Sequence, residues 1–164
     1  MRSARAAWAR RYGWCPAPNC PRWWGPTDPA AVAEEWLGHE ADGMVFVIEL
    51  DGVVVGSIQY AEETDPDYRH AGVDLFLTTS AQGQGIGPDA IRTIARYLID
   101  VRGHHRLTID PSAANERAIR AYSKLGFRPV GVMRRYERGA DGTFHDGLLM
   151  ELLAEELLED GTQA

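Results

Sequence analysis

The sequence has only two cysteines, Cys15 and Cys20, and no nearby histidine pair that would complete a zinc site with them. It also lacks an apolar run long enough to span a bilayer, and its basic first residues are not followed by the apolar stretch of a signal peptide. The sequence therefore predicts no metal site, no membrane partner and a cytoplasmic location, where both cysteines remain free thiols.

Basic residues are few as well. There are 17 Lys and Arg against 24 Asp and Glu, which gives a formal net charge of −7. Proteins that bind nucleic acid normally carry a basic face, so this balance argues against such a partner. An acidic chain suits a cationic small molecule, although acidity also serves solubility alone. The length of 164 residues and the hydrophobic content of 45% indicate one domain over residues 1–164.

The expected order of elements is helix, hairpin, strand, helix, strand, helix, hairpin, which predicts an α+β fold around one mixed sheet. Asp28, followed by proline, begins a first helix that ends near residue 38. Asp51-Gly52 lies between two β-branched runs and predicts a hairpin turn. The later elements are a strand at 71–77, a helix from 88 to about 101, a strand at 105–110, a helix from 115 that stops at Gly126, and strands at 127–137 and 144–153. Residues 1–26 are proline-rich and irregular, with no recognisable first strand.

Three glycines, Gly83, Gly85 and Gly87, occupy every second position just before the helix expected at Pro88. A helix N-terminus has free N–H groups and a partial positive charge, and glycines let an anion approach the backbone. The segment is not a Walker loop, because no Lys-Ser or Lys-Thr pair follows the last glycine. The pattern alone therefore leaves two interpretations open, a phosphate site or a tight entry into a helix.

Residues Gln82 to Gly87 match the Q/R-x-x-G-x-G/A motif, and the sequence therefore resembles the GCN5-related N-acetyltransferases, the GNAT family. Asn115 with AIRAYSKLGF resembles the second landmark of that family, N-x-x-A-x-x-x-Y-x-K-x-G-F. The resemblance runs from about Met44 to Leu153. It implies the GNAT fold, a mixed central sheet flanked by helices, and transfer of an acetyl group from acetyl-CoA to an amine.

The segments EETDPDYRHAGVDLFL and LTIDPSAANERAIRAY resemble the aminoglycoside 6′-N-acetyltransferase branch of that family. This likeness implies an aminoglycoside partner that is acetylated at its 6′-amine, with resistance as the result. No cysteine or serine has a convincing nucleophile setting, so we expect direct attack without an acyl-enzyme. Three other amines remain possible: a polyamine, a hydroxamate precursor or a protein N-terminus. So does a non-catalytic acyl-CoA-binding module.

The family resemblance also implies which residues bind acetyl-CoA. The backbone of residues 76–78 would pair with the pantetheine arm and donate an N–H to the oxyanion. Asn115 would bind the arm, or cap the helix that it begins, or both. Pro88 removes one N–H from the loop but is favourable at the first helical position. The expected cofactor-binding residues are Phe76, Leu77, Thr78, Gln82, Gly83, Gln84, Gly85, Ile86, Gly87, Asn115 and Tyr122.

Three residues are candidates for catalysis: Asp74, Tyr122 and Asp110. Asp74 lies inside an apolar strand, where a carboxylate could hold an ammonium group and accept its proton. The alternative is an edge-strand acid that faces water or an arginine. Asp110 would face the same cleft by resemblance, or serve as a turn residue before Pro111. The resemblance makes Tyr122 the proton donor to the CoA thiolate, whereas its helical spacing alone favours core packing.

An acidic loop with Glu62, Glu63 and Asp65, extended by Asp67, could attract a polycationic sugar, or could simply be solvated. Trp23 and Trp24 could stack on sugar rings, or pack against the first helix. The expected substrate-binding residues are Trp23, Trp24, Glu62, Glu63, Asp65, Asp74 and Asp110. His104 and His105 follow a helix end and are expected to be structural, and the segment RRYERG from Arg134 has no assigned role. The sequence does not decide between a monomer and a homodimer.

Overall fold

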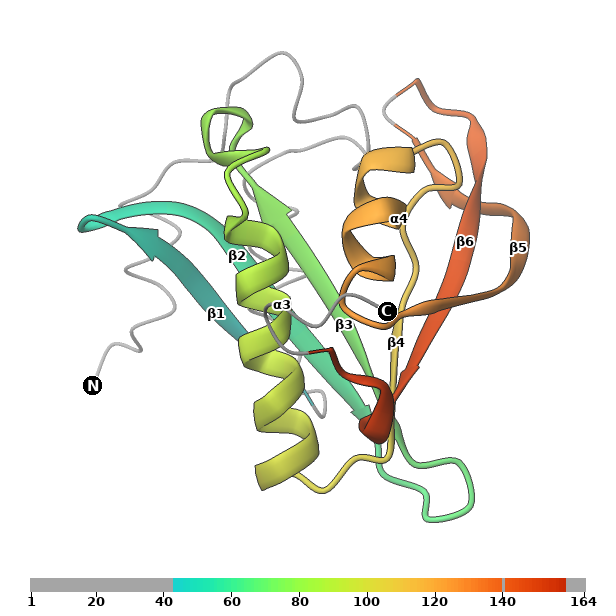
Figure 1. The fold of residues 1–164 in the computed structure, drawn as a ribbon. Helices are drawn as coiled ribbons and strands as arrows, with labels where there is room; N and C mark the ends of the chain where they lie inside the picture. The colour runs from blue at the N-terminus through green and yellow to red at the C-terminus, as the bar shows by residue number, and fades with distance from the viewer. Residues whose placement is uncertain (1–42, 140, 159–164) are drawn as a thin grey trace, which may run out of the picture.

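The computed structural model describes residues 43–139 and 141–158, which form one mixed sheet with two helices packed on it (Figure 1). The predicted α+β architecture is confirmed. The elements are β1 (Gly43–Leu50), β2 (Val53–Glu63), β3 (His70–Leu77), η2 (Thr79–Ala81), α3 (Ile86–Arg96), η3 (Tyr97–Val101), β4 (Arg106–Ile109), α4 (Glu116–Ser123), β5 (Arg128–Arg138), β6 (Phe144–Leu153) and η4 (Ala154–Glu156). The helix expected near 28–38, the irregular residues 1–26 and both cysteines lie outside the described residues.

The strand order in the sheet is β1-β2-β3-β4-β6-β5. Only the central pair, β3 and β4, runs parallel, and every other neighbouring pair is antiparallel. The central pairing is short: it joins Ala71 to Leu107 and Gly72 to Thr108, and then stops. Beyond these positions the two strands are no longer bonded to each other, although β3 continues to Leu77. On its other edge, β3 stays paired with β2 as far as Leu77.

The turn residues follow the sequence closely. Asp51 and Gly52 have φ values of 50° and 79°, so both central residues of the β1–β2 hairpin are left-handed, as a type I′ turn requires. Gly126 has a φ of 107° just after α4, which confirms it as the residue that stops this helix. The predicted hairpin of β5 and β6 is also present.

The start of α3 differs from the expectation. The helix begins at Ile86 with Gly85 as its N-cap, so Pro88 is the third helical residue and not the first. Proline is tolerated there because the first N–H groups of a helix have no carbonyl partner in any case. The α-helical part also ends at Arg96, and the rest of the predicted helix is the π-helical turn η3.

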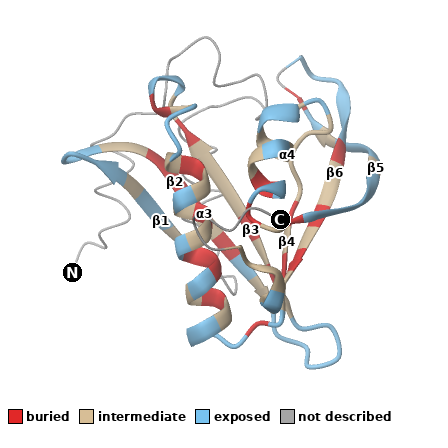
Figure 2. Cartoon of the chain, viewed as in Figure 1, coloured by how far each residue is buried: buried red, intermediate tan, exposed pale blue. Residues whose placement is uncertain are grey.

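The core lies between the sheet and the two helices (Figure 2). In β3, Ala71, Val73 and Leu77 are buried toward the helices. Side chains alternate along a strand, so Asp74 projects from the opposite face of the sheet. The same alternation in β4 buries Leu107 and places Asp110, just after Ile109, on the face of Asp74. The two candidate carboxylates therefore share the face that α3 and α4 do not cover.

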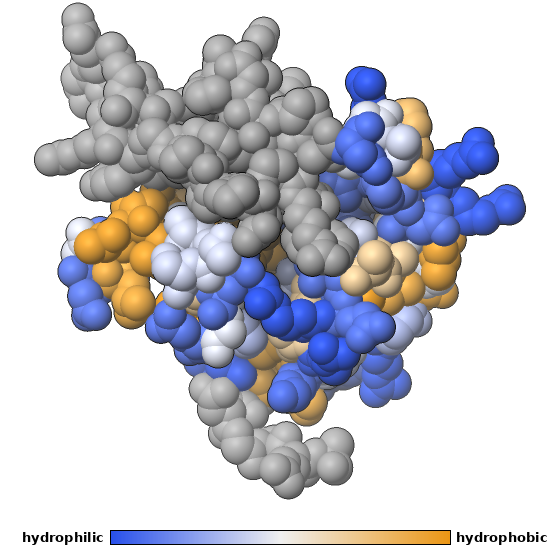
Figure 3. Space-filling model, turned by 90° about the horizontal axis from the view of Figure 1, so that it is seen from above, coloured by the Kyte–Doolittle hydropathy of each residue, from blue (hydrophilic) through white to orange (hydrophobic). Residues whose placement is uncertain are grey.

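Exposed apolar side chains gather on the β1–β2 hairpin, among them Val47, Leu50 and Val53. Figure 3 shows apolar surface on that side of the molecule, beside a largely hydrophilic face. In the described part of the chain, no helix is both long and apolar enough to span a membrane.

Candidate functional site

A pocket of about 410 Å³ opens where the end of β3, the glycine loop and α4 meet, a size typical of small-molecule sites. Most of the residues that the sequence assigned to acetyl-CoA line it: Phe76, Leu77, Gln82, Gly83, Gly85, Gly87, Asn115 and Tyr122. Thr78, Gln84 and Ile86 are not part of the lining. The amide of Thr78 instead donates to the carbonyl of Val55, at 2.8 Å. That N–H is therefore not available to a ligand.

The glycine loop has the geometry that an anion site needs. Gly83 and Gly85 have φ values of 79° and 82°, and a Cβ added to either would meet nothing within 4 Å. These glycines are thus required by backbone conformation, and the space beside them is open. The first N–H bonded within α3 is that of Asp89, which donates to Gly85. The amides of Ile86 and Gly87 are among the orphan donors of a helix N-terminus, and a phosphate group fits them.

The side chains of Gln82 and Gln84 connect the glycine loop to neighbouring segments by hydrogen bonds. The side-chain amide of Gln82 donates to the carbonyl of Leu77 at 3.0 Å, and its oxygen accepts from Arg117 across the pocket. The side-chain amide of Gln84 donates to the carbonyl of Ser80 at 2.7 Å, which explains why Gln84 does not face the pocket. Gln82 therefore links β3, the loop and α4.

Three basic residues that the sequence analysis did not single out also line the pocket: Arg117 and Arg120 of α4, and Lys124, its C-cap. Their spacing of three and four residues places them along one side of the helix. That spacing is visible in the sequence and could have identified them. They add positive charge to a pocket whose loop already favours an anion. The other lining residues that were missed are Leu75, Pro88, Ala118 and Ala121.

Asn115 has the capping role considered for it, and its binding of the pantetheine arm stays a prediction. It is the N-cap of α4, and its side-chain oxygen accepts the N–H of Ala118 at 3.2 Å. It also lines the pocket. Because the oxygen is occupied by the cap, its side-chain amide nitrogen is the group that can serve a ligand.

Tyr122 lies on the buried face of α4, and its ring packs against Phe127 at a centroid distance of 6.3 Å. Burial raises the pKa of its phenol far above the usual value, and the nearby carboxylates of Asp74 and Asp110 raise it further. The hydroxyl is therefore protonated at any working pH. It can donate a hydrogen bond or a proton, but it cannot act as an anionic base.

Asp74 and Asp110 flank the gap between β3 and β4. Continued past Gly72 and Thr108, the parallel register would set these two residues opposite each other. The side chain of Asp74 accepts the N–H of Leu75 at 2.8 Å, and Gln59 of β2 reaches it at 3.4 Å. The structure thus brings together the three predicted catalytic residues, with Tyr122 on the helix side of the gap and the two carboxylates on the other.

Two further residues join this group from β5. The hydroxyl of Tyr136 donates to Oδ2 of Asp110, and this hydrogen bond, together with burial and the carboxylates, raises the pKa of Tyr136 to about 12. Burial raises the pKa of Glu137, and so do Asp74 and Asp110, which places its carboxylate near theirs. Asp74, Asp110 and Glu137 form a group of three acids, the carboxylate trio. Tyr136 and Glu137 lie in the RRYERG segment, whose sequence gave no signal of this role.

The acidic loop is not brought to the trio. Glu62 pairs with Ala71 in the sheet register, so its side chain lies on the helix face, where it accepts hydrogen bonds from Arg102 and His104. These partners lower its pKa, with Arg102 the larger cause. His104 is buried and has the structural role that was expected.

Glu63 and Asp65 are used within the loop. Glu63 accepts the N–H of Asp65, and Asp65 accepts that of Asp67, both at 2.9 Å. The loop joins β2 to the start of β3, roughly 13 Å along the strand from Asp74 at about 3.3 Å per residue. Its expected contact with substrate is therefore not supported by its position. Trp23 and Trp24 lie outside the described residues.

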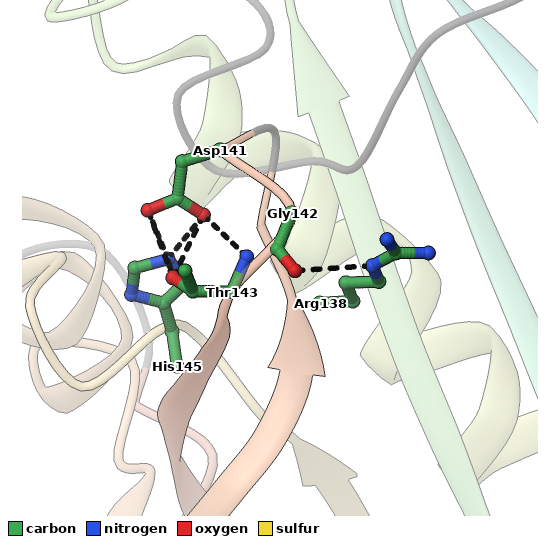
Figure 4. Close-up of polar contacts among 5 residues, drawn as sticks. All are labelled: Arg138, Asp141, Gly142, Thr143 and His145. Atoms are coloured by element: carbon green, nitrogen blue, oxygen red, sulfur yellow. Dashed lines mark hydrogen bonds and ion pairs between the residues drawn. The ribbon is translucent and has the colours of Figure 1, made fainter.

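The turn that follows Glu137 is tightly bonded (Figure 4). Asp141 accepts from the backbone and hydroxyl of Thr143, at 2.9 Å each, and from His145 at 3.0 Å. These contacts, led by His145, lower the pKa of Asp141 to about 2. Arg138 donates to the carbonyl of Gly142 at 3.2 Å. The end of β5 that bears Glu137 is thus tied to the start of β6.

Comparison with known proteins places these features in context. The model of the acetyltransferase (GNAT) family matches residues 8–127. An aminoglycoside N(6′)-acetyltransferase type 1 from Klebsiella pneumoniae is 29% identical over 144 residues, covering 76% of this chain and 71% of that protein. The spermidine N(1)-acetyltransferase of Escherichia coli K12 is 25% identical over 122 residues, covering 74% and 64%. The ribosomal-protein-S5-alanine acetyltransferase of Vibrio fischeri has a similar structure, with a TM-score of 0.72, 18% identity and coverage of 87% and 84%.

Proposed function

The chain belongs to the GNAT acetyltransferase family, and from that premise we propose that it acetylates the 6′-amine of an aminoglycoside with acetyl-CoA as co-substrate. The observation that carries the proposal is that the pocket, Tyr122 and the carboxylates of Asp74 and Asp110 meet at one gap in the sheet. Tyr122 lines the pocket beside the glycine loop, and Asp74 and Asp110 are close enough to raise the pKa of its hydroxyl, after burial.

Acetyl-CoA would lie in the pocket with its pyrophosphate against the amides at the start of α3. Arg117, Arg120 and Lys124 would face its negative charge from α4. The end of β3, beyond its pairing with β4, would bond the pantetheine arm through its backbone, without the amide of Thr78, which is already used. This arrangement brings the thioester to the gap between β3 and β4.

The transfer requires a neutral amine, because only a neutral amine has a free lone pair to attack the thioester. An aliphatic amine is mostly protonated near pH 7, so a base must first remove a proton. Asp74 would hold the ammonium group and accept its proton, directly or through water. The amine nitrogen then forms a bond to the thioester carbon, while a backbone N–H of β3 stabilises the oxyanion. As the carbon–sulfur bond breaks, Tyr122 donates its proton to the departing thiolate. The nitrogen loses its second proton as it becomes an amide nitrogen, and this proton, passed on directly or through water, restores the hydroxyl of Tyr122, while the proton held by Asp74 leaves to solvent. No residue of the chain is acylated in this sequence.

The carboxylate trio supports a substrate with several positive charges. Burial is the main cause of the raised pKa of Glu137, and repulsion by Asp74 and Asp110 adds to it; a polycation would relieve that repulsion. Aminoglycosides are polycations of this kind, and the relative from Klebsiella pneumoniae is named for that substrate. A second candidate, spermidine, is favoured by the Escherichia coli relative and by the same trio.

The test is release of CoA thiol from acetyl-CoA by the purified protein. Neomycin and paromomycin form a matched pair, since paromomycin carries a hydroxyl in place of the 6′-amine. We expect turnover with neomycin, little with paromomycin, and mass-spectrometric addition of one acetyl group. Asp74→Asn should lower the rate by a factor of about 10² or more. Asp67→Asn, in the exposed loop, is the control and should have no effect.

Other outcomes separate the alternatives. Turnover with spermidine but not with neomycin would replace the aminoglycoside by a polyamine. Equal turnover with neomycin and paromomycin would move the acetylated amine away from the 6′ position. Tight CoA binding in calorimetry, without turnover of any amine, would indicate an acyl-CoA-binding module and refute the proposed reaction.

A further inference from the structure

The hydroxyl of Tyr136 donates a hydrogen bond to Oδ2 of Asp110 and leaves Oδ1 of this carboxylate to a ligand. We propose that Tyr136 is a positioning residue, which aims Asp110 at a substrate ammonium group so that Asp110 anchors the amine while Asp74 reacts with it. This inference rests on the proposed function, because it assigns a role within the same site. It assigns different roles to Asp74 and Asp110, which the sequence alone could not distinguish.

An irregularity in β5 places Tyr136 over the gap. Met133 pairs with Gly147 and Glu137 pairs with His145, so three residues of β5 face a single residue of β6. Arg135, at the middle of this bulge, has a φ of 52°, and its N–H donates to Oδ1 of Asp146 at 2.8 Å. A bulge turns the side chains beside it in a new direction. Here it brings Tyr136 and Glu137 toward Asp110 and Asp74.

Gly147 provides the space for the Tyr136 ring. A Cβ at this glycine would lie 2.8 Å from Cδ1 of Tyr136, closer than carbon atoms can pack. The ring therefore lies directly against the backbone of β6. An alanine at position 147 would push the ring away without removing its hydroxyl, which makes this position useful as a second probe.

The turn after Asp110 is anchored to the same stretch of β6. The carbonyl of Asp146 accepts the N–H of Ala113, and the carbonyl of Pro111 accepts the N–H of Leu148, both at 2.8 Å. Asp146 thus bonds the turn with its backbone and the bulge with its side chain. Tyr136 and Asp110 are held by neighbouring residues of one strand, which fixes their separation.

The hydrogen bond uses Oδ2 of Asp110, so Oδ1 remains for a cation. A tyrosine hydroxyl that donates to a carboxylate restricts its rotation and stabilises its charged form. Tyr136 is about half exposed, at 51%, so this contact is not a by-product of core packing. Loss of the hydroxyl would free Asp110 to rotate and would weaken amine binding more than it slows the chemical step.

Steady-state kinetics with the best amine substrate test the proposal. Tyr136→Phe should raise KM for the amine about tenfold, as expected for a lost hydrogen bond to a charged group. Neither kcat nor KM for acetyl-CoA should change by more than about twofold. Gly147→Ala should act in the same direction, and Tyr68→Phe, at an exposed loop position, should have no effect. In an Asp110→Ala background Tyr136→Phe should add nothing, because the two changes remove the same contact.

A second measurement does not depend on turnover. In protein labelled with ¹³Cζ-tyrosine, the resonance of Tyr136 should remain that of a protonated phenol at pH 10.5, because its pKa is about 12. In Asp110→Ala it should titrate at a lower pH than in the wild type, although burial still holds its pKa above the ordinary 10.0. Asp74 is the smallest of the causes that raise this pKa, so Asp74→Asn should change the titration much less.

The outcomes distinguish this inference from the proposed function. If the wild-type protein acetylates no amine, the proposed function fails, and with it the assignment of Asp110 as anchor, whatever the resonance shows. If turnover is found but Tyr136→Phe lowers kcat with KM unchanged, the positioning role is overturned while the function stands. Identical titration of Tyr136 in the wild type and in Asp110→Ala would also overturn it.

Discussion

Replacing Glu62 by glutamine tests the reassignment of the acidic loop most directly. The carboxylate accepts two hydrogen bonds from Arg102, at 3.1 and 2.7 Å, and one from His104 at 2.6 Å. The side chain of Glu62 is 8% exposed and that of His104 is fully buried. Glutamine keeps the shape and one acceptor oxygen, but it loses the charge and turns an NH₂ group toward donors. We expect the fold to be destabilised and catalysis to be unchanged.

The magnitude follows from the exposure of the two partners. The Arg102 side chain is 45% exposed, so solvent screens its ion pair with Glu62 and this pair adds little to stability. The hydrogen bond to buried His104 contributes roughly 1.5–3 kcal/mol, as is usual when one partner is charged. Glutamine retains part of both, so the expected loss of unfolding free energy is about 2 kcal/mol.

Urea unfolding followed by far-UV circular dichroism measures this loss. With a slope of roughly 2 kcal/mol per molar urea, the midpoint should fall by about 1 M. Glu63→Gln, at the next and exposed position, is the matched control and should change stability by less than about 0.5 kcal/mol.

The pH dependence has a defined sign. Because the pKa of Glu62 is lowered below its ordinary 4.5, its contribution is fully present above that value and is lost as the pH falls through the lower folded pKa. The difference between wild type and Glu62→Gln should therefore shrink in acid. The reasoning is refuted if Glu62→Gln unfolds like the wild type but raises KM for a polycationic amine, which would restore substrate steering by this loop.

Two further predictions concern the cofactor pocket. Gly85→Ala should lower the free energy of unfolding by about 1–2 kcal/mol, because the φ of Gly85 is 82°, and should also weaken CoA binding in calorimetry. Gly52→Ala, at a φ of 79° far from the pocket, should lower stability alone. Equal CoA affinity in both variants would contradict the loop assignment. Tyr122→Phe should lower kcat by a factor of about 10² with little change in KM for acetyl-CoA. Because the pKa of Tyr122 is raised, the wild-type rate should show no alkaline loss from this group below pH 10. An unchanged kcat would assign Tyr122 to core packing.

Local signals in the chain predicted much of the architecture. The hairpin at Asp51-Gly52, the cap at Asn115 and the stop at Gly126 were all correct, because each depends on the backbone preference of one or two residues. The start of α3 was wrong by two residues. The rule that places proline in the first helical position is only a preference, and the helix here begins two residues earlier, after Gly85 in the left-handed conformation.

The site was predicted less evenly. The glycine loop and α4 are contiguous motifs, so their residues could be identified in the sequence and do line one pocket. The partners of Glu62 could not be predicted, because the two faces of a strand alternate with every residue and charge alone does not tell which face a carboxylate occupies. Tyr136 and Glu137 were missed because a bulge in β5 changes the direction of their side chains, and no residue pattern predicted that bulge.

By itself, the sequence determined the family, the α+β order of elements and the cofactor loop, since these depend on neighbouring residues and short-range backbone geometry. Only the tertiary structure decided which acids meet. Asp74 lies in β3, Asp110 directly follows β4 and Glu137 lies in β5, and their approach depends on where β3 and β4 stop pairing and on how β5 bulges against β6. Contacts between residues so far apart in the chain are set by strand register and packing, which no single segment encodes.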